Sequence, residues 1–180
     1  MTLSEIEKSR IVDRVSKKAG DNEELSISCA QGTLTALQEE FNLGGGTDVL
    51  KAATFMPGVA SRKETCGAFL GGLMALGLMF GRDKLYDPSY REPATVKEYA
   101  ARKKRTAWKF CEELKKELGS TQCRDIHTRL MGREYEFMNP EDFQQFLKDG
   151  GSKQCRVPPE TAARIAARII LEELGEDAGA

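Results

Sequence analysis

An apolar, glycine-containing run extends from Cys66 to Phe80 and limits the possible folds more than any other part of the sequence. Drawn as a helix, the run is apolar around its whole circumference, which is typical of a helix buried at the centre of a domain. It is shorter than the roughly 20 apolar residues that a membrane span needs, and charged residues flank it on both sides. The sequence therefore predicts a central buried helix and no membrane insertion.

Composition indicates that the elements around this helix are also helical. The chain has 18 Ala, 17 Leu and 19 Glu, whereas Val and Ile together number only 13. The first three residues favour helices, and strands prefer β-branched residues. Periodicity and capping signals predict helices over about 4–18, 28–41, 47–55, 95–118, 122–130, 139–147 and 159–174. Gly20 is expected to break the first of these helices, Gly119 to end the helix 95–118, and Asn139 to start the helix 139–147. We therefore expect an all-α fold, a single compact domain of about six to eight helices.

No linker, repeat or low-complexity tract divides the 180 residues. Residues 1–20 are expected to form an N-terminal helix that could lie at the periphery, and residues 21–180 form the helical domain that contains every cysteine. The first 20 residues are charged throughout and do not read as an export signal. A cytoplasmic location is therefore expected, where thiols stay reduced.

The charged residues nearly cancel, with 27 basic against 28 acidic side chains. Such a balance offers no field that would hold a polyanion, so nucleic-acid binding is not expected. It also argues against a polybasic membrane-binding patch.

Four of the five cysteines lie at or beside predicted helix starts. Cys29, Cys66 and Cys123 fall in a first turn, and Cys155 lies in a loop just ahead of the last helix. A helix N-terminus presents free N–H groups and the positive end of the dipole, which lowers the pKa of a thiol. If these helix starts converge, they form a pocket for thiolates. Cys111 lies in the middle of a helix on its apolar face and is expected to be a small hydrophobic filler.

Cysteine spacing alone does not identify the chemistry. The chain has no C-x-x-C pair of a zinc ribbon or thioredoxin motif and no C-x-x-C-H haem attachment site. Unrelated buried thiols therefore remain an alternative on spacing alone.

Small residues in the central helix point to a close approach. Gly67, Ala68 and Gly71 follow Cys66, and glycine inside a helix costs about 1 kcal/mol relative to alanine. Either another helix crosses closely at these positions, or they leave space for a cofactor beside the helix.

The segment Cys66–Gly71 reads C-G-A-x-x-G, and it lies between Cys29 and the later Cys123 and Cys155. This order resembles a redox-active protein family with a C…CGAxxG…C…C pattern, over about residues 28–174. The apolar residues 72–78 and the segment 119–124 are similar to that family too. A related domain occurs in the split-Soret cytochromes, where an iron–sulfur centre accompanies haem. The resemblance implies a redox function.

Our leading hypothesis is that Cys29, Cys66, Cys123 and Cys155 meet in one pocket and bind an iron–sulfur cluster of unassigned type for electron transfer. Two alternatives stay open: a cluster-free dithiol/disulfide pair, and a structural or interaction module with a four-cysteine zinc site. A redox partner protein is expected, and a homodimer is possible. No enzymatic reaction is assigned.

Three further residues could support the cysteines. Arg124 and Arg156 each follow a cysteine directly, so they could stabilise thiolate charge or dock an acidic partner. His127 lies four residues after Cys123, a spacing that places both on one side of a helix, where the imidazole could be a fifth ligand or a proton donor.

Overall fold

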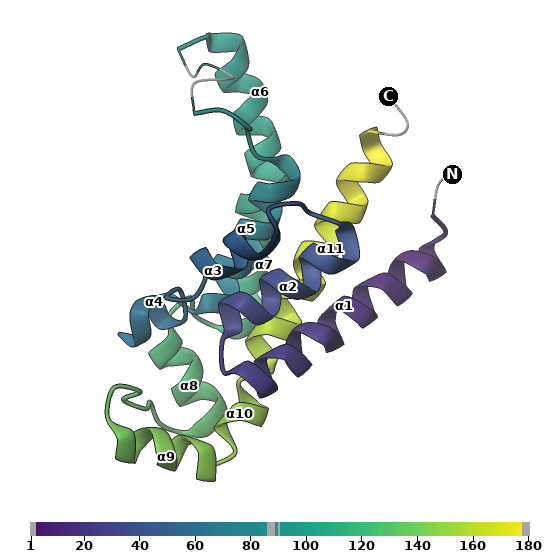
Figure 1. Ribbon diagram of the computed structural model, residues 1–180. Coiled ribbons are helices and arrows are strands. Elements are labelled where there is room, and N and C mark those ends of the chain that lie inside the picture. Colours follow the sequence, from purple (N-terminus) through teal and green to yellow (C-terminus); the bar gives the residue numbers. More distant parts are fainter. Residues whose placement is uncertain (1–2, 86–88, 90, 178–180) are drawn as a thin grey trace.

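The computed structural model describes residues 3–85, 89 and 91–177 (Figure 1). These residues form helices joined by turns and contain no strand, which confirms the all-α class. The helix predicted over 47–55 is present as α3 (Gly46–Ala52). The four-residue helices α4 (Gly58–Ser61) and α10 (Gly151–Gln154) were not predicted and add to the six to eight expected from the sequence. Within the described residues, no helix combines the length and the apolar character that crossing a membrane requires.

Four helices form the main bundle. The helix α1 (Glu5–Ser26) packs along α2 (Cys29–Phe41) and α11 (Val157–Asp177), and α2 and α11 also contact α5 (Gly67–Phe80) (Figure 1). The side chains of the main hydrophobic cluster include Leu34, Leu37, Phe110, Ile165 and Ile169, all fully buried.

The first helix is longer than the sequence predicts. The expected break at Gly20 does not occur, and α1 continues to Ser26, where Ile27 adopts a left-handed conformation with φ of 51°. A Cβ atom at Gly20 would lie 2.1 Å from Glu160 Oε1 on α11. Gly20 is therefore a point of close approach between two helices, and it does not stop the helix.

The predicted helix 95–118 is present in three consecutive parts. They are α6 (Pro93–Lys103), a π-helical turn η1 (Lys104–Trp108) and α7 (Lys109–Leu118). α7 buries Phe110, Leu114 and Leu118, and Gly119 ends it with φ of 81°. The glycine stop is where the sequence predicts it.

A smaller group of elements lies at one end of the bundle, at the lower left of Figure 1. It comprises α8 (Cys123–Met131), α9 (Pro140–Lys148) and α10 (Gly151–Gln154). Tyr135, Phe146 and Cys155 form a second hydrophobic cluster here, separate from the main one. Cys155 is the C-cap of α10, two residues before α11 begins at Val157.

Candidate functional site

The four cysteines that we expected to meet do lie around one cavity. Cys29 is the first residue of α2, Cys66 is the N-cap of α5, and Cys123 is the first residue of α8. Together with Cys155 they line a cavity of about 30 Å³ between the two hydrophobic clusters. All five cysteines of the chain are free thiols, and Cys111 packs against the main core outside this cavity. We call this cavity the thiol pocket.

Backbone pairing fixes two of the cysteines beside each other. The Cys66 N–H donates to the carbonyl of Thr121 at 2.9 Å, and the Cys123 N–H donates to the carbonyl of Glu64 at 2.6 Å. An antiparallel bridge between Thr65 and Gln122 lies between these bonds. These backbone bonds therefore fix the start of α5 relative to the start of α8, where both helices reach the pocket.

Glycine brings a third cysteine to the same place. A Cβ atom at Gly67 would lie 2.6 Å from Cys29 Sγ, and one at Gly71 would lie 2.3 Å from the carbonyl oxygen of Ala30. Of the two explanations for the small residues, close crossing of α5 and α2 is the one with contacts in the structure. Gly67, Ala68 and Gly71 do not line the pocket themselves. These small residues affect the pocket indirectly, because the close helix crossing that they allow positions Cys29.

The pKa values of Cys29, Cys123 and Cys155 are raised, which corrects our expectation of lowered values at the helix starts. The Cys123 pKa rises to about 12, chiefly because the thiol is desolvated, and the Cys155 pKa rises for the same reason. The Cys29 pKa is raised first by a hydrogen bond with the Cys66 thiol and then by burial. A backbone N–H at Gly67 does stabilise the Cys29 thiolate, but the desolvation of the pocket outweighs this helix-start effect.

This correction gives a pH-dependent prediction for the metal-free chain. With a pKa near 12 instead of the ordinary 9.0, Cys123 is about a thousandfold less ionised at pH 8 than a free thiol. Its alkylation by iodoacetamide should therefore rise about tenfold per pH unit up to pH 11, without levelling off. Peptide mass spectrometry measures the rate at Cys123, with glutathione as the reference thiol. A plateau near pH 7 would instead indicate the low-pKa thiolate that the helix start alone predicts.

The His127 side chain contacts the sulfur atoms of two pocket cysteines. Its Nε2 atom lies 3.6 Å from Cys123 Sγ and 3.3 Å from Cys155 Sγ, so the four-residue spacing on α8 does bring Cys123 and His127 together. The ring is 4% exposed and sits among Tyr135, Phe137 and Phe146. Burial lowers the His127 pKa to about 4, so the imidazole is neutral at physiological pH.

Neither arginine that we expected at the site lines the thiol pocket. Arg156 binds Asp21, Glu24 and Glu160 and joins α11 to α1. Arg124 is exposed, with its nearest acidic partner Asp125 at 4.0 Å.

A strained segment forms one wall of the pocket. Residues 58–61 all have positive φ values, including 41° at Val59 and 56° at Ala60, and Lys63 follows with 63°. This left-handed conformation costs an L-residue about 1–2 kcal/mol, and most of all a β-branched one. We call residues 57–63 the strap. Strain of this kind concentrates at ligand sites.

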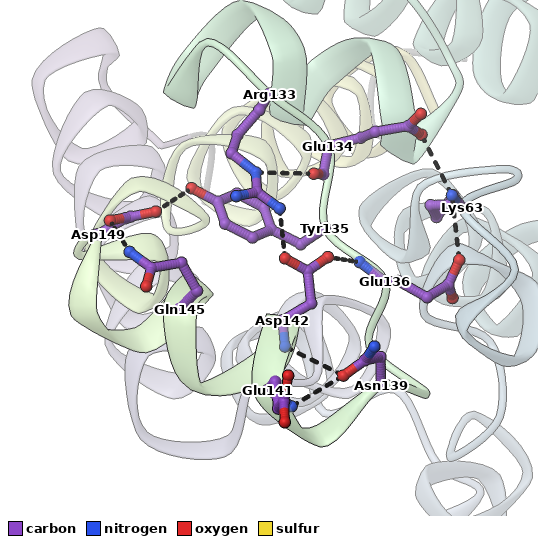
Figure 2. Close-up of polar contacts among 10 residues, drawn as sticks. All are labelled: Lys63, Arg133, Glu134, Tyr135, Glu136, Asn139, Glu141, Asp142, Gln145 and Asp149. Atoms are coloured by element: carbon purple, nitrogen blue, oxygen red, sulfur yellow. Dashed lines mark hydrogen bonds and ion pairs between the residues drawn. The ribbon is translucent and has the colours of Figure 1, made fainter.

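Lys63 ties the strap to the loop after α8. Its Nζ atom lies 3.1 Å from a Glu136 carboxylate oxygen and 3.5 Å from one of Glu134, as Figure 2 shows. The same loop is held by Tyr135, whose hydroxyl donates to Asp149 at 2.8 Å (Figure 2). Tyr135 also lines the pocket. Although Lys63 lines the pocket, its charge is therefore paired with carboxylates outside it.

Sequence reasoning missed several residues of the pocket, above all Glu23. This side chain is 3% exposed and lines the thiol pocket from α1. A signal was present, because Glu23 continues the buried stripe of Val15 and Ala19 at four-residue steps. Because the predicted first helix ended before Gly20, Glu23 lay outside it and was not recognised as a pocket residue. Within residues 3–85, 89 and 91–177, no three His, Cys, Asp or Glu side chains are already arranged to hold a single metal ion.

The described residues thus belong to an all-α protein in which four free cysteines line one buried pocket. A family model described as "Putative redox-active protein (C_GCAxxG_C_C)" matches residues 27–169, a range that contains all four of these cysteines. The chain belongs to this family, as the resemblance predicted. Searches of curated proteins and of solved structures found no match.

Proposed function

We propose that this protein transfers electrons through an iron–sulfur cluster held by Cys29, Cys66, Cys123 and Cys155. The observation that supports this proposal most is that these four thiols, far apart in the sequence, are all free and line one buried pocket. Four thiolates are the usual ligand set of [2Fe–2S] and [4Fe–4S] centres. A bound cluster would take up and release one electron at a time, and the electron donor and acceptor would be other proteins.

The surroundings of the thiols suit such a centre. Apolar walls from Ile27, Ile126, Phe137 and Phe146 keep water away, and the neutral His127 ring lies against two sulfurs. The backbone N–H of Gly67 would stabilise negative charge on the Cys29 sulfur, which raises a reduction potential.

Loading would have to widen the pocket. Its volume of about 30 Å³ equals roughly one water molecule's share of the liquid, so several irons need the walls to move apart. The strap is the wall with a conformational reason to move, because straightening its left-handed residues relieves strain.

Anaerobic reconstitution with iron and sulfide tests the proposal. The full-length chain should retain iron and acid-labile sulfide in stoichiometric amounts and show thiolate-to-iron charge-transfer absorption that bleaches on reduction. Aerobic preparations lose such centres readily, so purification must also be anaerobic. Iron that stays at background under these conditions would contradict the proposal.

The Cys29 and Cys66 thiols line the same pocket, and Cys66 is the first cause of the raised Cys29 pKa; this close interaction supports a second candidate function. In this function the two thiols lose two electrons and two protons to an acceptor disulfide such as oxidised glutathione, and they form a Cys29–Cys66 bridge. Mass mapping after oxidation without metal tests it. A reversible two-electron titration with this bridge would favour the candidate over the cluster.

A further inference from the structure

The thiol pocket contains an acidic side chain that the four-cysteine hypothesis does not use. Glu23 reaches the pocket from α1, a helix that carries no cysteine. Its side chain is almost completely buried, and its Oε2 atom has no hydrogen-bond partner. Buried polar atoms nearly always have a partner, so an orphaned carboxyl oxygen in a cavity indicates that something belongs beside it.

Neighbouring groups do not offset the cost of burying the Glu23 carboxyl group. The nearby backbone N–H of Ser28 lowers the pKa of Glu23, but burial raises it by more. Lys63 is the basic side chain that lines the pocket, and it is engaged by Glu134 and Glu136 (Figure 2). Without a counter-charge, burial raises the Glu23 pKa to about 8.

Glu23 is also electrostatically coupled to the cysteines. Glu23 lines the same pocket as Cys29, Cys123 and Cys155, and its charge raises the pKa values of these three thiols. All of these groups are anionic when ionised, and each makes ionisation of the others harder. A cation bound among these groups would instead favour the ionised form of each of them.

We propose that Glu23 is a fifth protein ligand of the metal centre, an oxygen donor that binds one iron of the cluster held by the four cysteines. The inference rests on the proposed function and goes beyond it by adding a ligand of a different chemical class. Thiolates are soft ligands and carboxylates are hard ones. The iron that Glu23 binds should therefore be distinct from the others in its spectrum and in its exchange.

Glu23→Gln tests this ligand because the amide keeps the size of the side chain and is a much poorer iron ligand. Glu24→Gln is the matched control, since Glu24 is the next residue of α1 but pairs with Arg156 outside the pocket. The full-length chain and both variants are reconstituted anaerobically with iron and sulfide. Mössbauer spectra and the rate of iron transfer to EDTA are then compared.

In Glu23→Gln we expect one iron component to change its Mössbauer parameters and iron loss to EDTA to be at least fivefold faster. Glu24→Gln should match the wild type in both measurements. Identical spectra and rates in all three proteins would overturn the inference and leave the four-cysteine cluster standing. A wild-type chain that takes up no iron would overturn both.

A measurement on the wild type covers the case in which the variant does not fold. The protein is labelled with ¹³C at the side-chain carboxyl carbon of glutamate, and the reduced, paramagnetic centre is examined by electron–nuclear double resonance. A through-bond ¹³C coupling is expected from a ligated carboxylate. The absence of any such coupling in the iron-loaded protein would contradict the assignment of Glu23 as a ligand.

Discussion

Gly71→Ala should destabilise the fold by about 3 kcal/mol, because the added methyl group would meet backbone that cannot move aside cheaply. The new Cβ atom would lie 2.3 Å from the carbonyl oxygen of Ala30 and 3.1 Å from Thr33 Cβ. α5 and α2 would have to separate, and Cys29 at the start of α2 would move away from Cys66. Equilibrium urea unfolding measures the change in the free energy of unfolding.

The matched control is Gly77→Ala in the same helix. A Cβ atom at Gly77 would meet nothing within 4 Å, so the only expected effect is the better helix propensity of alanine, a gain of about 1 kcal/mol. The two substitutions should thus change stability in opposite directions. A similar small change in both would mean that the close contact between α5 and α2 does not exist in solution.

Cys123→Ser should reduce the iron and sulfide content after anaerobic reconstitution to a small fraction of the wild-type value. Serine is nearly isosteric with cysteine, but its hydroxyl is a poor ligand for iron in such centres. Cys123 is 9% exposed, lines the pocket and shares the contact with His127 Nε2 with Cys155, so its loss removes one of the four thiol donors. Iron and sulfide assays with circular dichroism separate lost binding from lost folding.

Cys111→Ser is the control for this substitution. Cys111 lies on α7 and packs half-buried against the main core, outside the thiol pocket. The variant should keep full iron content and lose only a little stability. Equal iron loss in Cys111→Ser and Cys123→Ser would show that the effect is a general one of removing a thiol, and that the pocket cysteines are not special.

Much of the fold could be predicted from sequence because helix periodicity and stop signals are local. Asn139 caps α9, and Gly119 ends α7, as expected. Gly20 misled the prediction because its role depends on Glu160, which is 140 positions away in the sequence. A glycine that permits close packing has the same local pattern as a glycine that ends a helix.

The sequence was sufficient to predict which cysteines share a cavity, but not the direction of their pKa shifts. Helix starts identified Cys29, Cys66 and Cys123 as a related set, and the structure brings them to one cavity with Cys155. The direction of the thiol pKa shifts depends on how completely the cavity is desolvated, which no local pattern contains. The strap was equally hidden, because Val59 and Ala60 carry no sequence signal for a left-handed backbone.

The thiol pocket lies at the seam between two hydrophobic clusters, the main bundle and the smaller group around Phe146. An occupant bound to cysteines from both sides would fasten these two parts together. The loaded molecule would then open only as a whole, whereas the empty one could release residues 132–155 first. If the proposed cluster is that occupant, proteases should cleave molecules without the cluster faster than molecules that carry it.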